Sequence, residues 1–327
     1  MEKQLPKSLI EAIRYFADPD VCVEFVASMR WPDGVVCPHC EGKRVSYLKS
    51  RRIWKCMAKD CHKQFSVKTF SVFEDSPIPL DKWLTAVWLV VNCKNGISSY
   101  ELARDLKVTQ KSAWFMLHRI RLALKNGFFE RMGSSGGPIE ADECYIGGKP
   151  KNMHAGRRMK LLAQYGEHVP KPAVFGMLDR ETRQVRATVF AKIERGALMC
   201  EILNNAKQGV PLFTDQHKAY DYAQKHFIHE TVNHMKEYVR GEVHTNGIEN
   251  FWSLLKRGLS GTYVSVEPFH LSRYVDEQAF RFNNRATKDN PLNDADRFAL
   301  AVSQIAGKRL TYAELTGKVG ETTPEPF

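Results

Sequence analysis

The sequence predicts a multidomain protein of mixed α+β and α/β class. Short strand-like runs lie among paired cysteines in residues 37–68, and helical periodicity fills residues 81–127. From residue 139 onward the order is strand, hairpin, helix, strand, helix. We therefore expect a small cysteine-rich module, then a helical module, and last a mixed sheet flanked by helices.

Changes of pattern along the chain mark the expected domain boundaries. The run MGSSGGP at 132–138 predicts a linker between the two halves. The expected segments are a helical arm at 1–30, a cysteine ribbon at 31–72, a helix-turn-helix domain at 80–131, a mixed-sheet domain at 136–290, and a C-terminal helix with a disordered tail at 291–327.

The charge of the chain favours a polyanionic partner. Its 327 residues include 48 Lys and Arg against 37 Asp and Glu, which gives a formal charge of +11. Nucleic acid is the first class of partner to consider at this charge. The longest apolar run is far shorter than a bilayer requires, and the charged start is unlike a signal peptide. We expect a cytoplasmic protein that does not associate with a membrane.

Four of the eight cysteines form a cluster with metal-ligand spacing. Two pairs, CPHC and CMAKDC, are separated by a stretch of short strands, so all four thiolates can converge on one tetrahedral zinc ion. Disulfides are the alternative, but a reducing compartment disfavours them. His39 and His62 are possible substitute ligands. The expected ligands of a structural zinc ion are Cys37, Cys40, Cys56 and Cys61.

The segment ISSYELARDLKVTQKSAWFMLHRIRLAL predicts a helix-turn-helix. Ser98 and Glu101 form a capping box that begins its first helix. The second helix carries Lys111 and Arg119, which we expect to contact DNA.

Three acidic residues stand at strand ends or on a helix. Asp142 lies in the strand IEADECYI, Asp215 closes the apolar strand VPLFTD, and Glu249 shares a helix face with Lys256. Carboxylates brought together near a cation suit divalent metal ions facing a phosphate backbone. Acids at strand ends are also often plain solvated turn residues, so spacing alone leaves both interpretations open.

Two neighbours compete with Asp142 for the role of first acid. In a strand, Glu140 shares the face of Asp142, whereas Glu143 points to the opposite face.

The motifs IEADECYIGG, LFTDQHKAY and HTNGIENFWSLLKRGLSGTY, taken with CPHC, CMAKDC and SYELARDL, resemble those of the zinc-ribbon, DDE-class transposases of bacterial insertion sequences. The similarity runs from about Pro32 to Asn284. It implies an RNase H-like core in which Asp142, Asp215 and Glu249 bind two Mg²⁺ or Mn²⁺ ions. It also implies that Lys256, with Arg257 beside it, contacts DNA.

Family variation leaves some positions open. Some members have Asn or His as the third acid, so Asn246 and His244 are alternatives to Glu249. The family pattern favours Asp142 over its acidic neighbours. Phe70 stands where the family pattern has glycine.

The resemblance implies a transposase that recognises terminal inverted repeats in double-stranded DNA, cleaves there and joins the ends to target DNA. Such a protein is expected to act as a homodimer or larger assembly on nucleoid DNA. A DNA-binding regulator without enzymatic activity and an RNase H-like nuclease without strand transfer are the alternatives. The basic stretch 149–160 is equally compatible with a DNA contact and with a solvated loop.

Overall fold

The structure is a computed structural model that describes the chain in several stretches. These are residues 5–125, 130–147, 154–165, 171–215, 220, 222–232, 243–288 and 290–318. The chain forms two compact units, described here separately: unit 1 contains Met1–Asn126 and Asn284–Phe327, and unit 2 contains Gly127–Asn283.

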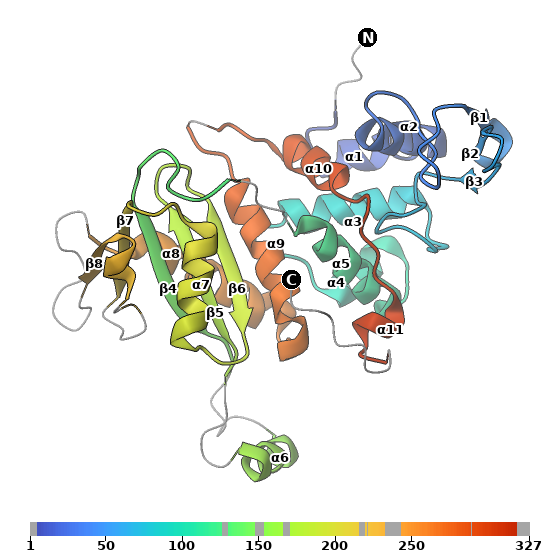
Figure 1. Ribbon diagram of the computed structural model, residues 1–327. Helices are drawn as coiled ribbons and strands as arrows, with labels where there is room; N and C mark the ends of the chain where they lie inside the picture. The colour runs from blue at the N-terminus through green and yellow to red at the C-terminus, as the bar shows by residue number, and fades with distance from the viewer. Residues whose placement is uncertain are drawn as a thin grey trace. The chain divides into compact units, whose positions relative to one another are not determined.

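Unit 1 contains a helical core built around α3 (Figure 1). This helix is apolar almost all round, so α1, α2, α5 and α10 can pack against it on different sides. The described helices of unit 1 are α1 (Leu9–Tyr15), α2 (Pro19–Arg30), α3 (Leu80–Asn92), α4 (Ser99–Leu106), α5 (Gln110–Leu124), α10 (Asp294–Ser303) and α11 (Tyr312–Leu315).

The predicted helix-turn-helix corresponds to α4 and α5, which pack against each other. Ser98 caps α4 as expected, since its side chain accepts a hydrogen bond from the Glu101 amide. Lys107 ends α4 in a left-handed conformation, and Thr109 caps α5 through the Ser112 amide. The local sequence therefore specifies both ends of the turn.

The C-terminal segment completes the core of the N-terminal half. Phe298 of α10 is fully buried and packs against Phe16, Phe25 and Trp88, with ring centroids 5.2–5.6 Å away. Residues 284–318 thus group with unit 1, although the sequence places them after the mixed sheet. The predicted disordered tail, TTPEPF at 322–327, lies outside the described residues.

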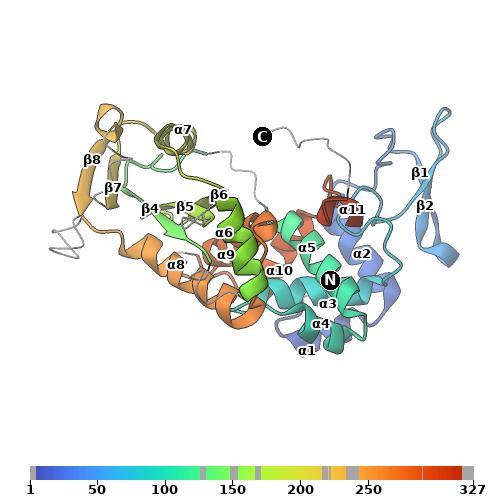
Figure 2. The same ribbon diagram turned by 90° about the horizontal axis from the view of Figure 1, so that it is seen from below.

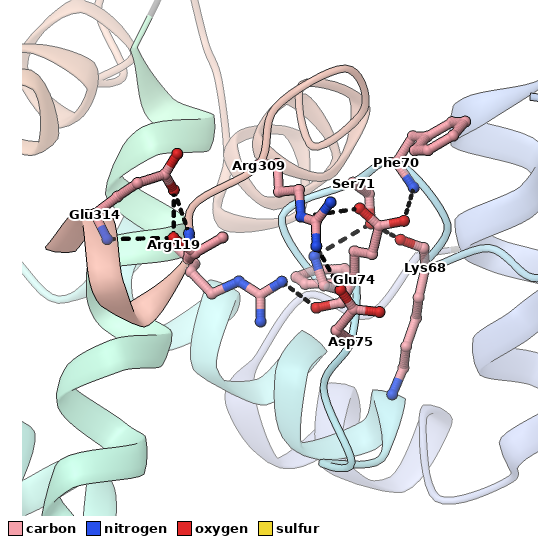
Figure 3. A network of polar contacts seen from close by, with 10 residues as sticks. Lys68, Phe70, Ser71, Glu74, Asp75, Arg119, Arg309 and Glu314 are labelled. Carbon is pink, nitrogen blue, oxygen red and sulfur yellow. Dashed lines mark hydrogen bonds and ion pairs between the residues drawn. The ribbon is translucent and has the colours of Figure 1, made fainter. Parts of the chain in front are cut away.

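A polar network holds this C-terminal segment to the loop that follows the ribbon (Figure 3). Arg309 pairs with Asp75 at 2.8 Å and with Glu74 at 3.5 Å. Glu74 also accepts a hydrogen bond from the amide of Phe70. Phe70 has φ +52°, a left-handed conformation that glycine adopts more easily.

The cysteine ribbon of unit 1 is a three-stranded antiparallel sheet in the order β1-β2-β3. Its small apolar cluster consists of Trp31, Trp54 and Phe65, whose rings lie within about 6 Å of one another. The strands are β1 (Val45–Leu48), β2 (Ile53–Cys56) and β3 (Gln64–Phe65).

Unit 2 is built on a mixed five-stranded sheet in the order β6-β5-β4-β7-β8. β4, β5 and β6 pair antiparallel, whereas β7 pairs parallel with both β4 and β8. The predicted hairpin is formed by β5 and β6. The strands are β4 (Ile139–Tyr145), β5 (Ala173–Asp179), β6 (Val185–Phe190), β7 (Pro211–Asp215) and β8 (Ile228–Val232).

Helices cover both faces of this sheet (Figures 1 and 2), and the predicted fold class is confirmed. Leu198 and Ile202 of α7 pack with Ala141 on one face, while Phe251 of α8 and Val275 of α9 pack on the other. The helices of unit 2 are α6 (Ala155–Tyr165), α7 (Arg195–Asn205), α8 (Asn246–Gly258) and α9 (Leu271–Asn283).

The predicted linker at 132–138 is wrong in part, because its first residues pack into unit 2. Met132 is 4% exposed and belongs to the core beneath α7. The amide of Gly133 donates to the buried carboxylate of Asp179 at 2.7 Å. The glycine-rich composition reflects tight turns here, since Gly133 and Gly136 have positive φ.

The basic stretch 149–160 lies partly outside the described residues, and its described part begins α6. Among the helices described, none combines the length and the apolar character needed to cross a membrane.

Replacing Phe298 with alanine should destabilise unit 1 by about 3–5 kcal/mol, because it leaves a cavity among three aromatic rings. Chemical denaturation followed by tryptophan fluorescence would measure this loss. The exposed Phe269 is the matched control, and F269A should change stability by less than about 0.5 kcal/mol. Equal effects of the two variants would contradict the role of α10 in the core.

Candidate functional site

The four predicted zinc ligands converge at one end of the ribbon. Sγ of Cys37 lies 3.8 Å from Sγ of Cys61, and Sγ of Cys40 lies 3.6 Å from Sγ of Cys56. Zinc–sulfur bonds of about 2.3 Å in a tetrahedron require sulfurs about 3.8 Å apart. All four thiols lie within 4.8 Å of one another, so the donor set fits a closed zinc site.

Backbone geometry around the cluster keeps the thiols in place. The amide of Cys37 donates to the carbonyl of Gly42, and the amide of Glu41 donates back to Cys37. A Cβ atom at Gly42 would lie 3.3 Å from Sγ of Cys40, so glycine leaves room for the sulfur. His39 packs edge-to-face on Phe70, and His62 is exposed. Neither histidine joins the cluster.

The acidic site of unit 2 is set by the register of two parallel strands. β4 and β7 pair from Ile139 opposite Leu212 to Ala141 opposite Thr214. The next residues along the two strands are Asp142 and Asp215. Because parallel strands point the same way, both aspartates lie at the same end of the sheet.

Ligand atoms of Asp142, Glu143 and Asp215 lie within 4.8 Å of one another. Glu143 was predicted to point away from Asp142, and it does begin on the α7 face, near Tyr220. The register of β4 with β7 runs to Ala141, so Glu143 lies beyond the last paired residue, and its carboxylate still reaches the two aspartates. A second acid directly after Asp142 is the signal that could have indicated this.

Glu249 lies in the first turn of α8, outside this group of three carboxylates. Its Oε1 accepts a hydrogen bond of 2.9 Å from the hydroxyl of Thr245, which orients the side chain. Its charge nevertheless reaches Asp142 and raises the pKa of that residue. Glu249 thus lies within electrostatic range of Asp142 but outside the group of three carboxylates.

Within the described part of the chain, the carboxylates are poorly compensated. Burial, with the charges of Asp215 and Glu249, raises the pKa of Asp142 to about 6. Burial and the two aspartates likewise raise the pKa of Glu143 to about 7. Oε1 of Glu143 and Oδ1 of Asp215 are buried without a hydrogen-bond partner among the described residues. Oxygen ligands of this kind fit a hard divalent cation.

Trp252 of α8 fixes the orientation of Asp142. Its Nε1 donates to Oδ2 of Asp142 at 2.9 Å. Gly176 lies opposite Asp142 on β5, and a Cβ atom there would lie 2.6 Å from the indole ring. Glycine at this position therefore allows the indole to approach the backbone of β5 closely. Trp252 is a core residue, as the apolar stripe of α8 predicts.

The four predicted DNA contacts divide into exposed and buried side chains. Lys111, Lys256 and Arg257 are exposed. Burial raises the pKa of the Cys144 thiol, and the charge of Lys256 opposes this rise. Lys256 therefore lies close to Cys144.

Arg119 is only 4% exposed and donates to the backbone carbonyl of Glu74 (Figure 3). Its guanidinium lies over the rings of Trp83 and Phe115. These contacts give Arg119 a packing role within unit 1 in place of the predicted contact with DNA.

A sheet with acids at the ends of two neighbouring strands, together with a four-cysteine ribbon, is the arrangement that the resemblance to zinc-ribbon transposases predicts. Comparison with protein families agrees. Residues 135–283 match the ISXO2-like transposase domain, and residues 18–64 match the transposase zinc-ribbon domain. Both matches are to transposase domains, and the recognition from sequence is confirmed.

One relative is an uncharacterized protein in transposable element ISH50 of Halobacterium salinarum. It is 28% identical over 257 residues, which cover 76% of this chain and 85% of the relative. Among solved structures, a cryo-EM structure of a simian T-cell lymphotropic virus intasome with PP2A regulatory subunit B56 gamma matches at 14% identity. It has a TM-score of 0.31 over 66% of this chain and 74% of that chain, a likeness too low to support an inference.

Removing zinc by chelation should unfold the ribbon, because its strands bury too little apolar surface to fold alone. Hydrogen exchange should then rise across 43–65 while α3 stays protected. Cys56→Ser should have the same effect and should lower zinc content below one ion per chain. The exposed, unclustered Cys200 offers the matched control, C200S. Unchanged protection of the ribbon after complete zinc removal would refute this role.

Asp142→Asn should stabilise the metal-free protein at pH 8 by roughly 1–3 kcal/mol, because a buried charge with a raised pKa disfavours the folded state. The folded state binds more protons than the unfolded state between about pH 4 and pH 6. The advantage of D142N should therefore shrink as the pH falls through this interval.

D142N should also lose the rise in melting temperature that Mn²⁺ gives the unaltered protein. Thermal melts across pH, with and without Mn²⁺, measure the pH dependence and the effect of the metal. Glu230→Gln, at an exposed position of β8, is the control that should change neither quantity. A pH-independent effect of D142N would show that charge is not its cause.

Proposed function

We propose that this chain is an enzyme that cleaves DNA at the terminal inverted repeats of its element and transfers the ends to target DNA. The observation that carries the proposal is the convergence of Asp142 and Asp215 at the ends of paired parallel strands. The match to a transposase domain supports the same reaction class.

Asp142, Asp215 and Glu249 are the proposed catalytic carboxylates and would hold two Mg²⁺ or Mn²⁺ ions. Two such ions supply activation of the attacking oxygen and stabilisation of the leaving oxygen in phosphoryl transfer. Oδ1 of Asp215 has no hydrogen-bond partner among the described residues, and the raised pKa of Asp142 shows that its ionised form is disfavoured. A bound cation would stabilise the ionised form of both carboxylates. Glu143 is an additional candidate ligand.

The protein's own cations would position the DNA. Lys256 and Arg257 lie in the last turn of α8, two turns beyond Glu249, where they can contact phosphates next to the cleaved bond. Lys111 lies in the first turn of the second helix of the helix-turn-helix motif, where recognition helices contact base edges. The ribbon and this motif together would recognise the terminal repeat.

Cleavage and joining of two ends call for at least a homodimer on DNA, and we propose that the complex acts on the nucleoid in the cytoplasm. The excess positive charge of the chain supports binding along the DNA backbone.

The test uses the zinc-loaded full chain with an oligonucleotide that carries a terminal repeat of the element. Asp142→Asn, Asp215→Asn and Glu249→Gln should each lower Mn²⁺-dependent cleavage by more than about 100-fold, while binding of the uncut DNA stays within twofold. Glu143→Gln tests whether the fourth acid is also required. The exposed variant E230Q should cleave normally.

The products distinguish the alternatives. Binding without any metal-dependent cleavage by the unaltered protein would indicate a regulator. Cleavage without joined products would indicate a nuclease. Full cleavage by D142N or D215N would reject the assignment of the site.

A further inference from the structure

We propose that Glu140 is a positioning residue that clamps the start of α8 to β4 and thereby places Glu249 beside the two aspartates. This inference rests on the proposed function, because it concerns how the third carboxylate is held. Nothing in the sequence motif distinguishes Glu140 from an ordinary acidic neighbour of Asp142.

Glu140 is an almost fully buried carboxylate, with 1% of its side chain exposed. It lies two residues before Asp142, so both side chains leave β4 on the α8 face. Its Oε2 accepts a hydrogen bond from the amide of Ile248 at 2.9 Å. Ile248 directly precedes Glu249 in the first turn of α8. The carboxylate of Glu140 thus contacts the backbone immediately beside the third acid.

Among the described residues, the N-cap residue of α8 provides no side-chain cap to the first turn, so the carboxylate of Glu140 takes that place. Thr245 occupies the N-cap position, but its hydroxyl donates to Glu249 and makes no capping bond to the backbone. Amides at a helix start need an acceptor, and negative charge there is favoured by the helix dipole. Glu140 supplies both from a strand more than 100 residues earlier.

Arg180 holds the same carboxylate from the other side. Its Nε donates to Oε1 of Glu140 at 2.7 Å, and its NH2 group lies 2.7 Å from both the carbonyl and Nδ1 of His244. The ring of Phe213 lies beneath the guanidinium. Arg180 therefore connects Glu140 with the residue that leads into Thr245 and α8.

The β5–β6 turn directs Arg180 toward this position. Asp179 is buried and accepts hydrogen bonds from the amides of Glu181 and Thr182. The amide of Arg180 donates to the carbonyl of Pro138, just before β4. The turn is therefore fixed to the strand that carries both Glu140 and Asp142.

Gly247 leaves the space that the clamp requires. A Cβ atom there would lie 2.8 Å from Oε2 of Glu140, so any side chain would displace the carboxylate or the helix. Glu140 and Asp142 then bind α8 at two points, the Ile248 amide and the Trp252 indole. Two bonds along one strand and one helix fix their relative register, and Glu249 lies between the two points.

The experiment measures Mn²⁺ binding to the zinc-loaded full chain without DNA, by calorimetric titration. Glu140→Gln keeps the shape but removes the charge, and it should weaken Mn²⁺ binding at least about tenfold. Glu249→Gln should weaken it as well. The double variant should bind no more weakly than E249Q, because Glu140 acts through Glu249. Glu181→Gln, an exposed change in the same turn as Arg180, should bind as the unaltered protein does.

Gly247→Ala provides a second route if E140Q fails to fold, since it leaves every charge in place and disturbs only the approach of Glu140 to α8. It should weaken Mn²⁺ binding in the same way and show no further loss in the E249Q background.

Each result bears on a separate statement. Normal Mn²⁺ binding by E140Q or G247A, with weak binding by D142N and E249Q, overturns the clamp but leaves the proposed function intact. Independent, multiplying effects of E140Q and E249Q also overturn it. Normal binding by both D142N and E249Q rejects the proposed metal site and the clamp together.

Discussion

The parallel pairing of β4 with β7 is the constraint on which the candidate active site depends. A register of three residue pairs carries two aspartates, 73 positions apart in the sequence, to one end of the sheet. A shift of one residue would turn either strand over and send its aspartate to the opposite face. The buried apolar residues of both strands oppose such a shift, since Ile139, Ala141 and Leu212 all face the α7 core.

The negative charge at this site lowers the stability of the folded state. Three carboxylates share a small, largely buried space, and burial with mutual repulsion raises the pKa values of Asp142 and Glu143. Glu140, one pleat away on the same strand, is compensated by Arg180 and a helix amide. The difference separates an acid that supports structure from acids available to a cation.

The cysteine ribbon in the N-terminal half is a small module that needs stabilisation beyond its own apolar core. The ribbon has short strands and one aromatic cluster, so a metal must contribute much of its folding energy. The helices beside it gain their core partly from α10, near the opposite end of the chain. Phe298 among the aromatic residues of α1, α2 and α3 makes the two ends of the sequence one unit.

The sequence by itself determined the local elements and the family. Period-two and helical patterns located β4 through β7 and α7 through α9, capping residues located α4, and cysteine spacing predicted the cluster of four thiols. These signals depend on residues within a few positions of one another, where backbone geometry is set by near neighbours.

Only the tertiary structure decided what depends on pairing between distant segments. It brought Glu143 into the acidic group, buried Arg119 against Trp83, packed Met132 beneath α7, and joined Glu140 to the start of α8. Apart from the acid that directly follows Asp142, no local pattern indicates these outcomes, because each follows from strand register or from the faces that two remote elements present to each other.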